Sequence, residues 1–180
     1  LIGGYVQNEW QSDALNLVIG ARLDKNNLID HVIVSPRANV RYTPIKNLIL
    51  RAGYTSGYRA PQAYDEDLHV MAVGGEASLI VLDPELRPEY SHSVTASADM
   101  YATAGKVQFN VLVEGFYTSL NDVFTLVEQH ADAAGNQVLM RTNADRAEVR
   151  GVNIEAKAAL DANNSLSVGY TYQRSTYREP

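Results

Sequence analysis

The stretch LILRAGYTSGYRAP, residues 48–61, decides how the rest of this chain is interpreted. Its apolar side chains fall on every second position, and one face of the segment is formed by Leu48, Leu50, Ala52 and Tyr54. Such a period of two is typical of a β-strand with one apolar side. Pro61 has no N–H to donate to a sheet ladder, so the strand is predicted to end there, where a long polar segment starts.

The same alternation recurs along the chain. Seven further segments show it, namely residues 3–10, 15–24, 32–43, 93–102, 107–128, 138–158 and 165–173. The sequence therefore predicts an all-β fold of about eight antiparallel, up-and-down strands without a convincing helix. Pro36 predicts a bulge or an unpaired ladder position, and residues 119–122 a break. The apolar patch at 79–82 is compatible with either a short strand or a folded-back loop.

The connections between the predicted strands alternate in length. Short turns at 10–13, 43–47, 103–106 and 161–164 alternate with longer or more polar segments at 24–31, 61–89 and 129–137. Short turns at one end and long loops at the other are typical of outer-membrane barrels. Most predicted strands also exceed the usual five or six residues of soluble sheets and match the 9–11 that cross a bilayer.

Composition excludes several classes of protein. The net charge of -6, without a basic cluster, argues against a nucleic-acid partner. The absence of cysteine excludes disulfides and thiolate chemistry. No run approaches the roughly 20 apolar residues of a membrane helix, which leaves a membrane β-barrel possible. Both ends look cut, because Leu1 is not Met and a strand is ending near Pro180, so we expect a piece of a longer protein.

Several short motifs in sequence order resemble the barrel of a TonB-dependent outer-membrane receptor. The Gly57-Tyr58-Arg59-Ala60-Pro61 end of the first strand is similar to the family's Gly-Phe/Tyr-Arg-Ala-Pro, and Leu86-Arg87-Pro88-Glu89 is similar to its loop-closing Leu-Lys/Arg-Pro-Glu. The motifs that follow are Gly115-Phe116-Tyr117, Asn121-Asp122-Val123, Asn143 and Gly151-Val152-Asn153-Ile154-Glu155. In the last of these the glutamate lies further from Gly-Val than the family usually has it.

The resemblance implies that residues 1–180 are part of a larger, 22-stranded membrane β-barrel, without the plug domain and the terminal strands. It implies a bacterial outer-membrane location, contact with the lipid bilayer, and outward-facing loops at 24–31, 61–89 and 129–137. The whole receptor would bind an extracellular small-molecule ligand, such as an iron-siderophore, haem or cobalamin, and import it with energy that TonB delivers through the plug. We expect no enzyme activity and no cofactor.

Candidate ligand contacts lie at and after the end of the first strand. They are Arg59, Tyr64, Asp65, Glu66, Asp67 and His69, chosen because the long loop would face outward. The acidic group with His69 is also compatible with a cation site, but the spacing fits no known metal loop and solvated acidic loops are common, so no metal is predicted. Arg59 is expected either to pair with an acidic group of the plug or loop, or to donate to loop carbonyls near Pro61. Glu89 is expected to accept hydrogen bonds from exposed loop amides.

Two rival interpretations remain open from the residues alone. One is a soluble β-barrel or sandwich that binds a small ligand, because an alternating strand also suits a solvated sheet. The other is an outer-membrane hydrolase using Ser91-His92-Ser93 and Asp99, although alternation places Ser91 and His92 on opposite faces. Eight strands cut from a barrel would leave open edges, so the isolated piece is expected to close on itself, associate or rearrange to bury Val107, Val111 and Val168.

Overall fold

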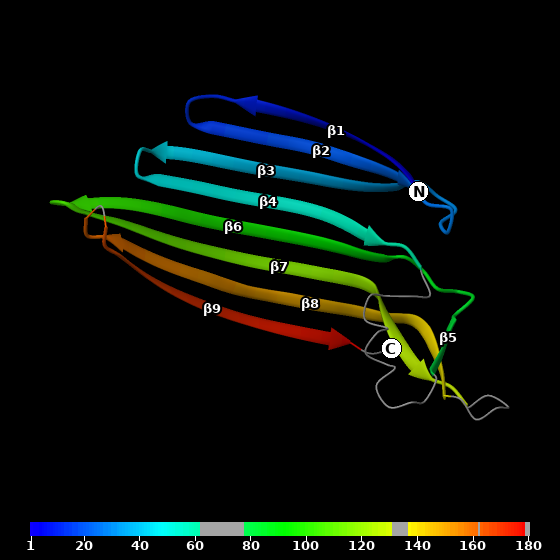
Figure 1. Cartoon of the computed structure of the whole chain (residues 1–180). Helices are drawn as coiled ribbons and strands as arrows, with labels where there is room; N and C mark the ends of the chain where they lie inside the picture. The colour runs from blue at the N-terminus through cyan, green and yellow to red at the C-terminus, as the bar shows by residue number, and fades with distance from the viewer. Residues whose placement is uncertain (62–77, 131–136, 162, 179–180) are drawn as a thin grey trace.

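Nine strands form one open, single-layered sheet (Figure 1). The computed structural model describes residues 1–61, 78–130, 137–161 and 163–178. The strands are β1 (Ile2–Gln11), β2 (Leu15–Lys25), β3 (Ile33–Ile45), β4 (Leu48–Arg59), β5 (Ser78–Leu82), β6 (Glu89–Ala104), β7 (Val107–Glu128), β8 (Gln137–Ala159) and β9 (Ser165–Arg178). The sheet order is β1-β2-β3-β4-β6-β7-β8, and both β9 and β5 pair with β8. The all-β prediction is confirmed, and the sheet is neither a closed barrel nor a two-sheet sandwich.

β5 is the strand that the estimate of about eight left out. It resolves the open interpretation of residues 79–82 in favour of a short strand, and it pairs with β8 in parallel, whereas every other pair is antiparallel. The position of β5 follows from the different lengths of β8 and β9. β9 pairs with β8 only between residues 146 and 159, so the edge of β8 at residues 137–141 is available to β5.

Three local predictions are refined. β4 ends at Arg59, two residues before Pro61. There is no bulge at Pro36, because the β2–β3 register runs through it unchanged; the β3–β4 ladder instead begins only at Arg37, as expected where a proline lacks its N–H. The register shift of β3 lies between Tyr42 and Ile45. β7 is continuous through residues 119–122, but Asp122 has a positive φ of 54° and is skipped in the β7–β8 register.

The two ends of the sheet differ as predicted. The short connections β1–β2, β3–β4, β6–β7 and β8–β9 all lie at one end, and the longer ones lie at the other, here called the loop end (Figure 1). Strands β7 and β8 extend furthest toward the loop end, with 22 and 23 residues. The two ends of the sheet are therefore built differently.

Cross-strand register gives the sheet one apolar face. Residues directly opposite one another on neighbouring strands share a face and form rows across the sheet. Four successive rows of β6, β7, β8 and β9 are apolar; they run through Ala102, Met100, Ala98 and Ala96 and include Phe109, Val111, Val113, Ala156, Ile154, Val152, Val168, Tyr170 and Tyr172. At about 6.8 Å a row, four rows span about 27 Å along the strands, or about 20 Å for a tilt near 40°.

Within the described residues, no hydrophobic core covers this apolar face. Buried hydrophobic side chains among the described residues are limited to Ile29, Ile33, Leu139 and Ala144. Val168 and Tyr170 are 61% and 62% exposed. A soluble sheet buries such a face against a second layer. Among the described residues this apolar face stays uncovered, and the expected self-association of the isolated piece stays a prediction.

The opposite face is polar and internally bonded. Asp99 is buried there and accepts hydrogen bonds from Arg51, Tyr101 and Asn110. Asn153 links Glu114 of β7 to Thr171 of β9. The sequence predicted that Leu48–Tyr54 alternates between an apolar and a polar side. This prediction is confirmed by the β4–β6 register, which places its apolar residues opposite those of β6.

Candidate functional site

The loop end of the polar face holds a group of interacting side chains that we call the rim cluster. Its members come from the ends of four neighbouring strands and from the chain entering β6. They are Arg59, Arg87, Glu89, Asp122, Phe124, Arg141 and Asn143. The cluster joins the motif residues of four separate stretches of sequence, which are far apart along the chain.

Phe124 is the residue of the rim cluster that contacts two cations. The Arg59 guanidinium is 5.4 Å from the centroid of its ring, and the Arg141 guanidinium is 5.8 Å away. Arg141 is buried and Arg59 is exposed. Because a cation over an aromatic face is held by the ring quadrupole, Phe124 fixes the position of an exposed positive charge.

Glu89 extends the link between β6 and β7 beyond their ladder. It faces Arg59 in the β4–β6 register, and its Oε2 accepts the backbone N–H of Phe124 at 3.1 Å. The β6–β7 ladder itself ends at the pair Tyr90 and Asn121. Glu89 was expected to serve a loop amide; the amide it accepts from belongs instead to β7, because β7 continues past the start of β6.

Asn143 ties the chain entering β6 to the outer half of β7. Its Oδ1 accepts the Arg87 N–H at 2.8 Å, and its Nδ2 donates to the carbonyl oxygens of Arg87 at 3.0 Å and Asp122 at 2.7 Å. The Arg87 guanidinium in turn lies 2.8 Å from Asp122 Oδ1. The positive φ of Asp122 takes its backbone out of the regular β7–β8 ladder. The Asn143 side-chain amide therefore donates to the Asp122 carbonyl in place of a ladder hydrogen bond.

Asp83 forms a second tether between the same chain segment and β8. Its Oδ1 accepts the Glu85 N–H, its Oδ2 accepts the Thr142 hydroxyl, and its own N–H donates to the carbonyl of Arg141. The bond from the Glu85 N–H, followed by that from Thr142, holds the pKa of the Asp83 carboxyl below its ordinary value. The segment that returns from the long loop is therefore anchored on β8 at two points.

One of the predicted ligand contacts lies in the rim cluster. Arg59 is placed at the end of β4, as an exposed cation on the polar face. Tyr64, Asp65, Glu66, Asp67 and His69 lie outside the residues that the structure describes. The pairing of Arg59 with a plug or loop acid stays a prediction.

Sequence reasoning missed Phe124 and Arg141 as partners of Arg59. Both lie on the polar-face parity of their strands, and an arginine in a strand near its loop end is a usable signal. Their meeting could not be foreseen, because it depends on the 20-residue register between β7 and β8. The need for a glycine at position 151 is likewise visible only in the structure. A Cβ at Gly151 would come within 2.6 Å of Phe116 Cζ.

The described histidines and the serines beside His92 do not come together into a catalytic group. His92 Nδ1 and the Tyr54 hydroxyl are 2.9 Å apart, and His31 Nε2 lies 3.1 Å from the Tyr90 hydroxyl. Ser93 bonds to Thr118 on the opposite face, where Asp99 is held by Arg51. His130 follows β7 and is exposed. Ser91, His92 and Asp99 are therefore not assembled as a hydrolase triad.

Over residues 1–61, 78–130, 137–161 and 163–178, no three His, Asp or Glu side chains come together as a possible metal site. In the same part of the chain, no helix is long and apolar enough to cross a membrane. What the rim cluster offers chemically is a fixed, exposed cation and a braced loop base, which suit binding.

Comparison with known proteins places this geometry in context. The sequence model of a family described as TonB dependent receptor-like, beta-barrel, matches residues 2–180. No curated protein matches the chain in sequence. Among solved structures, the siderophore receptor PirA from Pseudomonas aeruginosa is similar with a TM-score of 0.80 and 19% identity, over 97% of this chain and 34% of the receptor.

Two further solved structures share the fold. The FrpB iron transporter from Neisseria meningitidis has a TM-score of 0.72 at 17% identity, and the chain covers 25% of it. The copper transporter OprC has a TM-score of 0.64 at 13% identity, with 29% of it covered. The chain thus spans about a third or less of the length of these proteins, and at these identities the likeness concerns the fold.

Proposed function

This chain belongs to the TonB-dependent receptor β-barrel family, and from that premise we propose that it forms part of the wall of an outer-membrane receptor that imports a small extracellular ligand. The family is one of receptors and transporters, and its members are outer-membrane barrels. In the proposed arrangement the apolar rows face lipid, the polar face lines the interior, and the loop end faces outward. Transport itself would require the plug and TonB, as the resemblance implies.

The observation that carries this proposal is the division of one sheet into two faces. Four apolar rows form a band of about 20 Å in height, close to the roughly 25 Å apolar band of outer-membrane barrels. The other face is bonded internally through buried Asp99 and through Asn153. A single layer with these two faces is stable where lipid covers one and water or a plug the other.

We further propose an anionic ligand, such as a ferric siderophore complex. The support is the position of Arg59, an exposed guanidinium on the interior face at the loop end, held over Phe124 by a contact that also involves Arg141. Guanidinium groups bind carboxylate and catecholate oxygens through paired N–H donors. The similar proteins named for siderophores and iron are consistent with that ligand class.

The proposal is tested by uptake in cells that lack their own receptors. The full-length receptor is expressed, and uptake of radioactive ferric catecholate, hydroxamate and citrate complexes is compared with and without TonB. We expect uptake of at least one complex, and only when TonB is present. Uptake that persists without TonB, or receptor found in the soluble periplasmic fraction, would overturn the proposed function.

A second comparison addresses Arg59. Arg59→Gln should weaken binding of the transported complex to the purified receptor by about tenfold, the usual loss for one charge-assisted contact. Arg37→Gln is the matched control, because Arg37 is an exposed arginine of the same face without a ring contact. Equal affinity for both variants would remove Arg59 from the proposed ligand site.

A further inference from the structure

We propose that the polar face between β4 and β6 is a transit path for the imported anionic complex, leading from Arg59 at the rim to a second basic site formed by Arg41 and Arg51. This inference rests on the proposed function and extends it, because it concerns the movement of the complex after its capture. The path uses β3, β4 and β6, and each of these strands is paired with a neighbour on both sides.

The second basic site brings two arginines together on neighbouring strands. Arg41 and Arg51 are directly opposite each other in the β3–β4 register, and both are exposed. Arg51 precedes Arg59 by eight residues on β4, and this even spacing puts both on the polar face, about 27 Å apart along the strand. Like charges directly opposite each other on a sheet repel, so this position favours an anion.

The described residues neutralise only part of this charge. Arg51 Nη1 lies 3.3 Å from Asp99 Oδ2, and the same carboxylate accepts two further side-chain donors. Glu114, two strands from Arg51 in the same row, accepts a hydrogen bond from Asn153 of β8. Arg41 forms no ion pair or side-chain hydrogen bond within the described part of the chain. A positive charge is therefore available at the second basic site.

Small polar residues line the wall between the two basic positions, and we call them the hydroxyl strip. They are Gly57, Thr55 and Gly53 of β4 and, directly opposite them, Ser91, Ser93 and Thr95 of β6. A Cβ on Gly57 would come 3.0 Å from Ser91 Oγ, and a Cβ on Gly53 would come 3.1 Å from Thr95 Oγ1, so two of the hydroxyls lie close to the glycines. The strip therefore has low relief, and its hydroxyls can donate hydrogen bonds to the oxygens of a passing anion.

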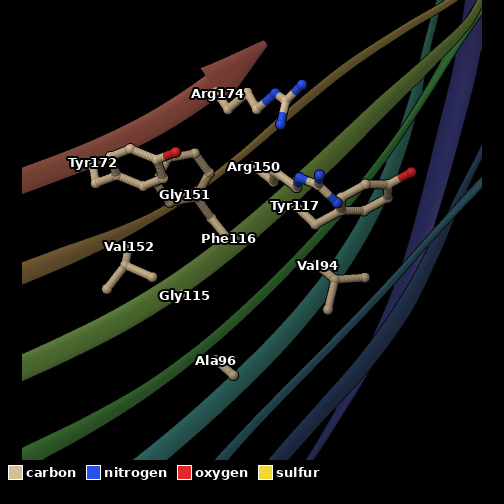
Figure 2. Close-up of a pocket in the computed structure, with 10 residues that line it drawn as sticks. All are labelled: Val94, Ala96, Gly115, Phe116, Tyr117, Arg150, Gly151, Val152, Tyr172 and Arg174. Carbon is tan, nitrogen blue, oxygen red and sulfur yellow. The ribbon is translucent and has the colours of Figure 1, made fainter. Parts of the chain in front are cut away.

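The hydroxyl strip is confined to the polar face of the wall. The residues that alternate with its hydroxyls along β6 are Val94 and Ala96, which lie on the apolar face with Val152 (Figure 2). Arg37 of β3 is on the polar face, but its Cγ lies 3.5 Å from the Cβ position of Gly20, and it lines a hollow with residues of β1 and β2. Arg37 is therefore a matched control outside the path.

Two cations joined by a neutral strip suit transport better than permanent binding. A charged species moves along a wall when each site attracts it but none holds it firmly, and Asp99 weakens the second basic site by pairing with Arg51. A fixed acid of the plug would also satisfy Arg41. Such a contact would not account for the small hydroxyl residues that lead to it from Arg59.

Uptake and binding measured on the same variants of the full-length receptor test the path. The probe is the radioactive ferric catecholate complex, or ferric citrate if the wild-type receptor imports that complex instead. In Arg41→Gln we expect the maximal TonB-dependent uptake rate to fall about tenfold, while the Kd of the purified receptor changes less than about twofold. Arg59→Gln should weaken the Kd itself, and Arg37→Gln should change neither quantity. An unchanged uptake rate in Arg41→Gln would overturn the proposal.

Two further measurements separate a transit path from a fixed contact with the plug. Thr95→Leu puts an apolar side chain into the hydroxyl strip and leaves the arginines in place; it should slow uptake at unchanged Kd, whereas Thr95→Ser should behave like the wild type. The thermal midpoint of purified Arg41→Gln should equal that of the wild type. Normal uptake in Thr95→Leu, or a lowered midpoint of Arg41→Gln together with entry of vancomycin into the cells, would overturn the proposal. Because each variant is compared with TonB-dependent uptake by the wild type, a failure here is distinct from a failure of the proposed function.

Discussion

The side-chain amide of Asn143 makes both hydrogen bonds that a neighbouring strand would make to Arg87. Its oxygen accepts the Arg87 N–H at 2.8 Å, and its nitrogen donates to the Arg87 carbonyl at 3.0 Å. The chain is thereby tied to β8 before β6 begins, at a point where it has no ladder partner. One side chain thus fixes where the long loop rejoins the wall.

Replacing Asn143 should release this connection. In Asn143→Ala, three hydrogen bonds are lost, two of them exposed and one, to the Asp122 carbonyl, partly buried, and we expect the free energy of unfolding to fall by about 1–2 kcal/mol. Hydrogen exchange should accelerate at Arg87 well before the β6 ladder is affected. Asn8→Ala, at an exposed asparagine of β1, serves as the control. Unchanged exchange at Arg87 would show that Asn143 does not hold the segment in place.

Asp122 combines a strained backbone with an ion pair, and two substitutions separate these effects. Asp122→Gly and Asp122→Ala both remove the contact with Arg87, but only glycine adopts a φ of 54° without strain. The glycine variant should therefore be more stable by about 1 kcal/mol in denaturant unfolding. At Asn121, which lies in the regular ladder, the order should reverse. Equal stability of the two Asp122 variants would remove backbone strain as the explanation.

Asp99 should be a sensitive carboxylate of the polar face. It is 7% exposed and accepts hydrogen bonds from Arg51, Tyr101 and Asn110. Asp99→Ala leaves these donors and the Arg51 charge without their acceptor, so we expect a loss of about 2–4 kcal/mol in the thermal or denaturant unfolding of the barrel.

The control for Asp99 is another charged pair of the same sheet. Glu155 and Lys157 are 2.9 Å apart but half exposed, and solvent screens such a pair. Glu155→Ala should therefore change stability little. Equal losses for Glu155→Ala and Asp99→Ala would mean that burial does not set the difference.

The turn between β8 and β9 should open only in strong acid. Asp161 accepts the Asn164 side-chain amide and the backbone N–H groups of Asn163 and Asn164, and these bonds, that of the Asn164 side chain foremost, hold the pKa of Asp161 below its ordinary value of 3.8. A lowered folded-state pKa means that the carboxylate stabilises the turn above the unfolded-state pKa. That stabilisation is lost as the pH falls through the folded-state pKa.

Amide chemical shifts of Asn164 in detergent micelles, followed against pH, check this prediction. The Asn164 shifts should remain constant as the pH is lowered to 4, and they should change only below pH 4. Asp161→Asn should remove the pH dependence, whereas Asp13→Asn, in the turn between β1 and β2, should leave it intact. A transition of the Asn164 signals at or above pH 4 would contradict the stabilising role of the ionised Asp161.

Much of the architecture could be predicted from the sequence alone, because alternation with a period of two assigns each residue of a strand to one of its two faces. Leu48 to Tyr54 indicates a strand with one apolar side from its period of two, and the turn residues around Gly105 and Asn164 mark where strands reverse. The asymmetry of short turns and long loops was readable in the same way. These are local properties, and neighbouring residues determine them.

Contacts between strands were decided only by the tertiary structure. The meeting of Arg59, Phe124 and Arg141, the pairing of β5 with the exposed edge of β8, and the opposition of Arg150 and Arg174 each depend on register between segments that are distant in sequence. Alternation fixes the face of a residue but not its height along a neighbouring strand. The sequence from Leu48 to Arg59 thus predicted a strand. Only the register with β6 placed the last residue of that strand, Arg59, opposite Glu89 in the rim cluster.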